Sequence, residues 1–140
     1  MTDTSFVFWL GRIRKALRAE FEARAEALEI TAAQFMVLRR LWQGDGILTS
    51  TLTRDCASDG GTITGVLDRL EGKGLIRRER CAEDRRAVRV LLMPAGRDLE
   101  APLMDILSFI NEQALEGLSG EERALLVRLL ERIGGNLGAK

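Results

Sequence analysis

The sequence predicts a mostly helical fold with one small β-hairpin. Apolar residues recur at steps of three and four over most of the 140 residues, which is the spacing of one helical face, and only two prolines interrupt them. Between residues 75 and 92 the pattern becomes short and alternating, as in β-strands on either side of a polar turn. The length and the hydrophobic content of 46% suit a single domain with a core, with or without added dimerisation helices.

The amino-terminal part is expected to form two helices. Residues 5–28 predict the first helix, because their large apolar side chains keep to one helical face. Those side chains are Phe6, Trp9, Leu10, Ile13, Leu17, Phe21 and Leu28. Thr31 and Gln34 have the spacing of a capping box, in which each side chain accepts from the other residue's backbone N–H. They predict the start of a second helix, which Gly44-Asp45-Gly46 would end.

A short strand and a short helix are expected next. Ile47-Leu48 fits a strand, and Thr49 or Ser50 fits the cap of a helix that runs to Cys56. The small and polar residues 57–61 then predict a turn of the chain.

The helix expected over about 60–72 has two unlike faces. Asp59 is its expected N-cap. The apolar face consists of Ile63, Val66, Leu67 and Leu70. The small and polar face consists of Thr62, Thr64, Gly65, Asp68 and Arg69. The first face would pack on the core and the second would be exposed.

Residues 75–80 and 87–92 predict the two strands of a hairpin. The second strand is rich in β-branched residues and alternates apolar side chains with Arg89. Cys81-Ala82-Glu83-Asp84 provides the polar connection between them.

Arginine is concentrated in this hairpin. Six of the 13 residues from 77 to 89 are arginine, although the formal net charge of the chain is +0. Residues 68–89 contain eight basic and five acidic residues, a net charge of +3, whereas residues 98–122 contain seven acidic residues and no Lys or Arg. This asymmetry indicates a polar partner that binds one region only.

Two further helices are expected after the hairpin. One would run from Pro94 to about residue 116, and Ser119 with Glu122 forms a second capping box that opens the last helix. Leucine and isoleucine recur on one face of that helix as far as Leu137.

The order of these elements describes a winged helix-turn-helix. Two short helices joined by a tight turn precede a two-stranded hairpin, which would be the wing. A helix with small side chains on its outer face can enter a DNA major groove about 12 Å wide. Arginines at the tip of a wing can neutralise phosphates or enter a narrow minor groove. The pattern therefore indicates binding to double-stranded DNA.

The run DRLEGKGLIRRERCAEDRRAVRVLLMPAGRDL, residues 68–99, closely resembles the MarR family of bacterial transcriptional regulators. In that family a helix ends in DRLE-x-x-GLI, a strand with arginine follows, the wing carries D-x-R, and a glycine follows the second strand. Asp84 and Arg86 fit the D-x-R positions. The run ITAAQFMVLRRL, residues 30–41, resembles the second helix of the family.

The resemblance implies a homodimer built from a single MarR-like domain, residues 1–140. Residues 30–93 would be the DNA-binding part, and residues 5–28 and 94–138 would be dimerisation helices. The two subunits would read a pseudo-palindromic operator and repress genes near their own. Release of DNA would follow when a small aromatic, phenolic or lipophilic effector binds.

Candidate site residues follow from the faces and from the resemblance. Those expected at the DNA are Thr62, Thr64, Gly65, Arg69, Arg80, Asp84, Arg85 and Arg86. The family often has a basic or polar side chain where this chain has Gly65, so recognition would depend more on the threonines, on Arg69 and on the wing. Those expected near an effector are Trp9, Arg12, Phe35 and Arg39, although the aromatic side chains among them fit the core equally well.

Composition argues against several other classes. The chain has no histidine, which removes the usual general base and the commonest zinc ligand, and its two cysteines cannot complete a tetrahedral zinc site. We therefore expect neither an enzyme nor a bound metal or cofactor. No apolar run approaches the ~20 residues that span a bilayer. The amino-terminal charges follow the apolar patch, in the reverse order of a secretory signal, so we expect a cytoplasmic protein.

Two alternatives remain open at this point. The chain could be a helical protein–protein interaction dimer whose hairpin contacts a protein, and binding would then depend little on salt. It could also be a redox-sensing regulator, because the arginines around Cys81 favour a thiolate, whereas Cys56 fits the core.

Overall fold

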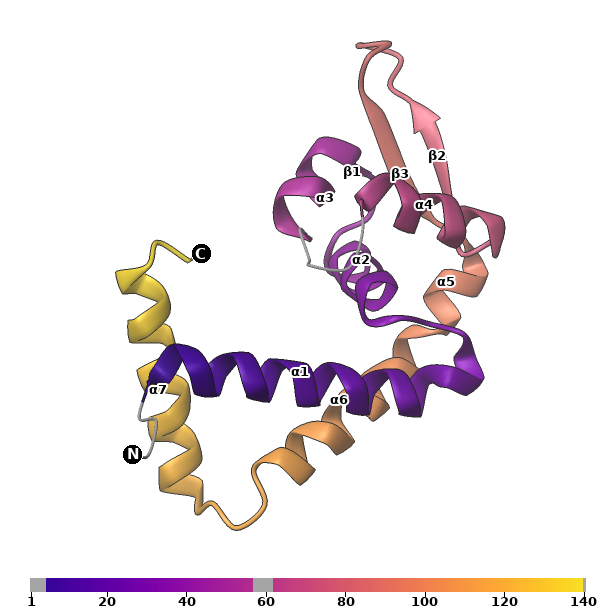
Figure 1. Ribbon diagram of the computed structural model, residues 1–140. Helices are drawn as coiled ribbons and strands as arrows, with labels where there is room; N and C mark the ends of the chain where they lie inside the picture. The colour runs from indigo at the N-terminus through magenta and orange to yellow at the C-terminus, as the bar shows by residue number, and fades with distance from the viewer. Residues whose placement is uncertain (1–4, 57–61, 140) are drawn as a thin grey trace. The chain divides into compact units, whose positions relative to one another are not determined.

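The computed structural model describes residues 5–56 and 62–139 (Figure 1). The elements run in the order α1 (Phe6–Ala25), η1 (Glu26–Leu28), α2 (Ala32–Gln43), β1 (Ile47–Leu48), α3 (Thr49–Asp55), α4 (Ile63–Gly72), β2 (Ile76–Arg80), β3 (Val88–Leu92), α5 (Pro94–Asp98), α6 (Glu100–Ala114) and α7 (Gly120–Asn136). The chain divides into two compact units, Met1–Leu107 and Ser108–Lys140. The first contains the sheet with α1 to α5 and the start of α6, and the second contains the end of α6 and α7.

The predicted hairpin is confirmed, and a third strand joins it. The sheet has three antiparallel strands in the order β1-β3-β2, with Ile76 opposite Leu92 and Ile47 opposite Val90. Val90 is buried and Arg89 is exposed, as the alternation predicts. Figure 1 shows β2 and β3 extending away from α2, α3 and α4 as a two-stranded wing. Together these elements form a winged helix-turn-helix.

The core of the first unit lies between the apolar faces of the helices and the sheet. Its most fully buried side chains are Val37, Leu38, Leu41, Leu52, Leu67, Leu70, Ile76, Val90 and Leu103. Phe35 packs on Phe21 with ring centroids 4.7 Å apart and on Trp42 at 6.1 Å, which joins α1 to α2.

Both predicted capping boxes are confirmed. At α2, Thr31 Oγ1 accepts from the Gln34 N–H and Gln34 Oε1 accepts from the Thr31 N–H, each over 3.2 Å. At α7, Ser119 and Glu122 make the same pair of bonds over 3.2 and 2.7 Å. These bonds satisfy N–H groups that have no partner within a helix.

Two helix starts differ from expectation. Neither Thr49 nor Ser50 caps α3, because the strand passes directly into the helix and Leu48, held extended by its pairing with Arg89, takes the cap position. Helix α4 begins at Ile63 rather than at residue 60. The cap expected at Asp59 lies outside the described residues.

The single helix expected over 94–116 is divided into α5 and α6 at Leu99. Pro102 explains the division, because it has no N–H for a bond within a continuous helix but fits the first turn of a new one. The first helix also ends earlier than predicted. It gives way to η1 at Glu26, and Glu29 then turns the chain with a left-handed φ of 57°.

The second unit is closed by one arginine. Arg123 of α7 pairs with Glu112 of α6 over 2.8 Å and donates to the carbonyls of Leu115 and Leu118 over 3.1 and 3.3 Å. Arg123 thus satisfies carbonyl groups of the connection between α6 and α7, where the chain reverses.

Candidate nucleic-acid interface

Helix α4 presents a small, polar face to solvent. Thr64 and Arg69 are exposed, while Val66, Leu67 and Leu70 are buried on the opposite face. Arg69 makes no ion pair or side-chain hydrogen bond to any described residue, since the neighbouring carboxylates on α4 bind an arginine of β2 instead. Its guanidinium is therefore available to an anion outside the protein.

Thr62 and Gly65 lie at the first turn of α4. Thr62 is the N-cap, and its Oγ1 accepts from the Gly65 N–H over 3.3 Å. A Cβ at Gly65 would make only ordinary contacts, 3.5 Å from Thr62 Oγ1 and 3.8 Å from Arg69 Nη1. Packing does not require glycine at this position. The absence of a side chain at Gly65 leaves the outer face of α4 without a protruding group there.

Asp84 shapes the tip of the wing. Its Oδ1 accepts from the Arg86 N–H and its carbonyl accepts from the Ala87 N–H, each over 3.0 Å. The Cys81 N–H closes the tip on the Ala87 carbonyl over 2.9 Å. The aspartate of the D-x-R motif thus bonds main-chain groups.

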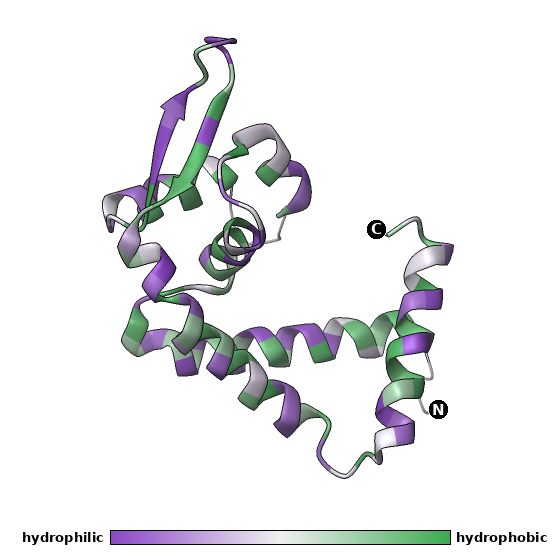
Figure 2. Cartoon of the chain, turned by 180° about the vertical axis from the view of Figure 1, so that it is seen from behind, coloured by the Kyte–Doolittle hydropathy of each residue, from purple (hydrophilic) through white to green (hydrophobic). Residues whose placement is uncertain are grey.

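The six arginines of the hairpin run divide into two groups. Four of them bond to protein groups: Arg77, Arg78, Arg80 and Arg89. Arg85 and Arg86, both exposed, make no side-chain bond to any residue that the structure describes. They lie at the tip of the wing, which Figure 2 colours mostly as hydrophilic. Free guanidinium groups concentrate where a long anion such as a phosphate backbone could reach them.

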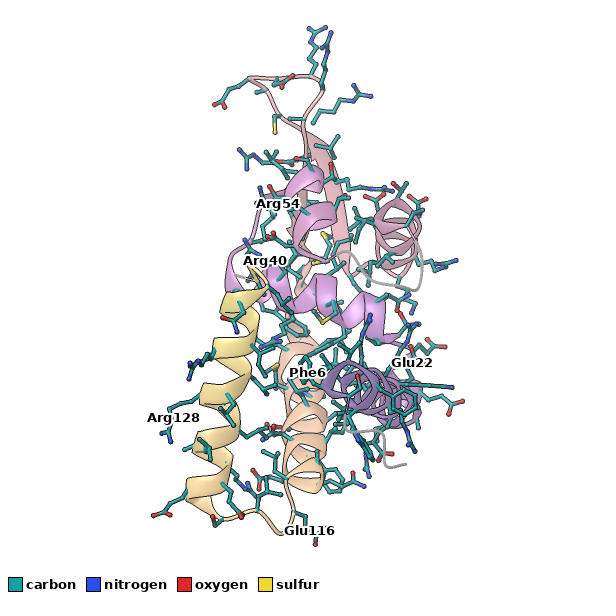
Figure 3. All side chains as sticks on the ribbon, turned by 60° about the vertical axis from the view of Figure 1, so that its left-hand side comes forward. Phe6, Glu22, Arg40, Arg54, Glu116 and Arg128 are labelled. Atoms are coloured by element: carbon teal, nitrogen blue, oxygen red, sulfur yellow. The ribbon has the colours of Figure 1, made fainter. Side chains whose placement is uncertain are left out.

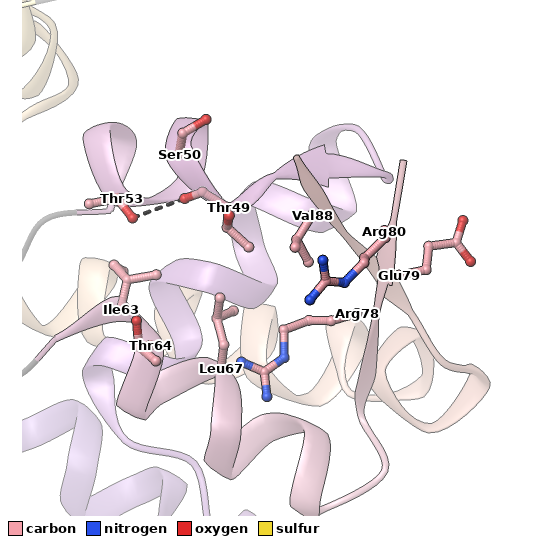
Figure 4. A pocket seen from close by; sticks show the side chains of 10 residues that line it. All are labelled: Thr49, Ser50, Thr53, Ile63, Thr64, Leu67, Arg78, Glu79, Arg80 and Val88. Atoms are coloured by element: carbon pink, nitrogen blue, oxygen red, sulfur yellow. Dashed lines mark hydrogen bonds between the residues drawn. The ribbon is translucent and has the colours of Figure 1, made fainter. Parts of the chain in front are cut away.

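A hollow of about 550 Å³ lies between α3, α4 and the wing (Figure 4). Its lining combines hydroxyl groups, an apolar floor and two strand arginines: Thr49, Ser50, Thr53, Thr64, Ile63, Leu67, Val88, Arg78 and Arg80. Glu79 also borders the hollow, but its side chain points away from α4. Its hydroxyl groups are donors suited to phosphate oxygens or another anion, whereas Arg78 bonds to Asp68 and Glu71 and Arg80 bonds to the Arg85 carbonyl.

Polar contacts fix α4 in place. Lys73, which follows α4, donates to the Glu29 carbonyl and to Gln34 Oε1 over 3.2 Å, so the helix end is tied to the start of α2. On its other side, Glu71 of α4 binds Arg78 of β2. The local sequence pattern identified neither contact, because each joins residues of separate elements.

Asp45, which follows α2, bonds to β3 and to α5. Asp45 Oδ1 accepts from the Gly46 and Leu92 N–H groups over 2.8 and 2.9 Å, and Oδ2 pairs with Arg97 over 2.8 Å. Sequence reasoning assigned this aspartate only to a turn.

Asp55 binds Arg54 and also Arg40 of α2. Figure 3 labels the two arginines, which lie on α3 and α2. The hydrogen bond from Arg54, followed by that from Arg40, lowers the pKa of Asp55. The pair with Arg40 ties α3 to α2, which orders the two helices before α4.

The expected effector residues do not gather in one place. Arg12 lies over the ring of Trp9 at 5.1 Å on the exposed face of α1. Phe35 is buried in the core against Phe21, and Arg39 is exposed on α2. Within one chain, Arg12 and Trp9 form a cation–π contact, and Phe35 packs on Phe21 in the core.

The two cysteines lie in different surroundings. Cys56 is buried with its Sγ 3.7 Å from the Met36 carbonyl, and burial raises the pKa of its thiol. Cys81 is half-buried in the wing, and both are free thiols. Among the described residues no group of His, Cys, Asp or Glu could hold a metal ion, and no helix is long and apolar enough to cross a membrane.

Comparison with known proteins assigns the chain to a family. Residues 30–88 match the model of the MarR family. A probable transcriptional regulator from Pseudomonas aeruginosa is 33% identical with a TM-score of 0.83, covering 95% of this chain and 99% of that one. A MarR family regulator from Silicibacter pomeroyi is 27% identical, with a TM-score of 0.76 and coverage of 92% and 87%. Bordetella bronchiseptica BpsR, whose DNA binding is regulated by 6-hydroxynicotinic acid, is 28% identical, with a TM-score of 0.84 and 96% of each chain covered. The chain therefore belongs to the MarR family of DNA-binding transcriptional regulators.

Proposed function

We propose that this protein binds a specific double-stranded DNA operator as a homodimer and represses genes near its own. The observation that carries the proposal is the pair of unpartnered arginines, Arg85 and Arg86, at the end of the wing. Because neither guanidinium is neutralised within the described part of the chain, both can contact phosphates or enter a minor groove.

Helix α4 is the proposed reading helix. Its exposed threonines and the absence of a side chain at Gly65 fit a major groove, and Arg69, which is unpaired among the described residues, can reach a base edge or a phosphate. The complete set proposed at the DNA is Thr62, Thr64, Gly65, Arg69, Arg80, Asp84, Arg85 and Arg86. Arg80, which donates to the Arg85 carbonyl over 3.1 Å, and Asp84 act mainly by holding the tip in shape.

Exposed apolar helix faces support the homodimer. Seven large apolar residues of α1, from Phe6 to Leu17, are between 40% and 74% exposed (Figure 2). Helix α7 likewise exposes Leu125, Val127, Leu129 and Leu130. Such rows of exposed apolar side chains are covered by a partner in stable proteins, and a second copy is the partner that a pseudo-palindromic operator requires. We assign residues 30–93 to DNA binding and residues 5–28 and 94–138 to dimerisation.

A small aromatic or lipophilic effector would release the DNA. The stacked pair of Trp9 and Arg12 offers a ring face and a cation, which suits an aromatic acid, and Phe35 and Arg39 are the further candidates. The regulation of BpsR by 6-hydroxynicotinic acid supports an effector of this class. The relatives are transcriptional regulators and not enzymes, and a regulator of this kind acts in the cytoplasm, where its DNA lies.

Fluorescence anisotropy tests the proposal. The purified protein would be titrated onto a labelled duplex from the region upstream of its own gene, with a scrambled duplex as reference. We expect preference for the native duplex, and we expect Arg86→Ala to weaken binding to both duplexes. Arg77→Ala is the matched control, because that arginine belongs to the same run but pairs with Glu79, so it should change binding little.

The salt dependence of the DNA-binding constant tests which arginines contact phosphates. It also distinguishes the proposed regulator from the alternative of a helical protein-interaction dimer. Arg69, Arg85 and Arg86 of two subunits would give a slope of log Kobs against log salt of about −5, whereas engagement of Arg69 and the whole arginine run would approach about −13. Equal and weak binding to both duplexes, with a slope near zero, would overturn the proposal in favour of the interaction dimer.

A further inference from the structure

Strand β2 is joined to helix α4 by one arginine and two carboxylates. Arg78 Nη2 donates to Asp68 Oδ1 over 2.6 Å and to Glu71 Oε1 over 2.9 Å, and Arg78 Nε donates to the same Glu71 oxygen over 3.2 Å. The other oxygen of Glu71 accepts the backbone N–H of Arg78 over 2.8 Å. One carboxylate thus holds the main chain and the side chain of a single strand residue, and the three residues form a brace.

The topology makes this brace effective. Strand β2 is at the edge of the sheet, and Glu71 closes that open edge at Arg78. Arg78 stands opposite Val90 at the middle of the hairpin and shares a strand face with buried Ile76. Figure 4 shows the Arg78 side chain extending from β2 to α4, whereas Glu79 points away from the helix.

The charge of Arg78 is satisfied within the protein. Its side chain is only 26% exposed, in contrast to the free arginines at the wing tip. The hydrogen bonds from Arg78 lower the pKa of Glu71, and those to Glu71 and Asp68 raise the pKa of Arg78. Both partners are therefore charged at neutral pH, and the guanidinium has few donors left for an external anion.

We propose that Arg78 and Glu71 are positioning residues for DNA recognition. The brace fixes the distance and angle between α4 and the wing, so that one rigid body carries both DNA-contacting elements. Ordering two contact surfaces before binding lowers the entropy lost in the complex, and it helps only the duplex that both surfaces fit. This inference rests on the proposed function, and it assigns to Arg78 no contact with DNA.

A charge-matched double substitution isolates the brace. Glu71→Gln together with Arg78→Gln removes one negative and one positive charge, so the net charge of the three brace residues stays at −1. Arg78→Lys is a second variant that keeps the positive charge and loses the forked geometry. Arg77→Gln together with Glu79→Gln is the control, because this ion pair joins two residues of the same strand and forms no bond to the described residues of α4.

Anisotropy titrations on the native upstream duplex and its scrambled counterpart measure the effect, over about 50 to 200 mM salt. For the double variant and for Arg78→Lys we expect the ratio of native to scrambled affinity to fall roughly tenfold or more. Scrambled-duplex affinity and the salt slope should remain those of the wild type. The control pair should leave all three quantities unchanged, and circular dichroism would confirm that each variant is folded.

The outcomes distinguish failure of the positioning role from failure of the proposed function. A double variant that keeps the wild-type affinity ratio within about twofold would overturn the positioning role while leaving the proposed function intact. Loss of scrambled-duplex affinity with a shallower salt slope would make Arg78 a phosphate contact, which also overturns it. A wild-type protein without preference for the native duplex would remove the proposed function and this inference with it.

Discussion

Replacement of Gly96 by alanine should destabilise the protein strongly. Gly96 lies buried in α5, and a β-carbon there would come well within 3.0 Å of the Leu75 carbonyl oxygen and within 3.2 Å of Leu92 Cδ2. Leu75 cannot withdraw freely, because its carbonyl accepts the Met93 N–H over 2.9 Å. The carbonyl of Gly96 itself accepts Trp42 Nε1 over 3.0 Å, so both sides of the contact are held.

The expected loss follows from these contacts. Relief of the overlap requires α5 to move by roughly 1 Å from the start of β2. Overpacking of this kind costs about 1–3 kcal/mol. Weakening of the two hydrogen bonds adds about 1 kcal/mol each, and the better helix propensity of alanine returns about 1 kcal/mol. The free energy of unfolding should therefore fall by about 2–4 kcal/mol.

Urea unfolding followed by tryptophan fluorescence and circular dichroism measures this loss at fixed protein concentration. The midpoint should fall by about 1–2 M with an unchanged slope. Gly72→Ala is the matched control, because nothing lies within 4 Å of a β-carbon at this last residue of α4, and it should leave stability unchanged or slightly raised. A Gly96→Ala protein within about 0.5 kcal/mol of the wild type would refute the close approach of α5 to Leu75.

Three further predictions follow from the described contacts. Thr31→Ala and Ser119→Ala each remove a side chain that accepts at a helix start, and each should lower the free energy of unfolding by about 1 kcal/mol, whereas Ser50→Ala should have little effect; urea unfolding of the three variants checks this. A thiol reagent at pH 8 should label Cys81 in the native protein and Cys56 only on unfolding, because Cys56 is buried and burial raises the pKa of its thiol. Mass spectrometry of the labelled protein measures this, and rapid labelling of Cys56 in the native protein would contradict it. The side-chain hydrogen bond from Arg78 is the chief cause of the lowered pKa of the Glu71 carboxyl, and the ionised carboxylate therefore stabilises the fold at pH values above the pKa of the unfolded state. This contribution is lost from about pH 5 downward, so Glu71→Gln should reduce the fall in the free energy of unfolding between about pH 5 and lower pH. Urea unfolding of both proteins across this pH range checks this, and identical pH dependence would contradict it.

Local patterns in the sequence predicted much of this fold. The capping boxes, the buried apolar face of α4 and the alternation of β3 each depend on residues within one element, and these are confirmed. The division at Leu99 was also available from the sequence, because Pro102 cannot donate within a continuous helix. The cap of α3 was less accessible, since Leu48 takes that position only through its strand pairing with Arg89.

The candidate site was harder to predict, because the availability of a charge depends on the tertiary structure. The sequence selects Arg80, Arg85 and Arg86 from the hairpin run, by the tip of the wing and the D-x-R motif, but it does not show which arginines bond within the protein. The fold then brings Glu71, seven residues earlier in the chain, against Arg78, while the turn at Asp84 leaves the Arg86 side chain without a partner among the described residues. A count of arginines therefore overstates the number of guanidinium groups in the wing that have no protein partner among the described residues. Under the proposed function, the other arginines of the run stiffen the wing, so that Arg85 and Arg86, which have no side-chain partner among the described residues, would act at a fixed distance from α4.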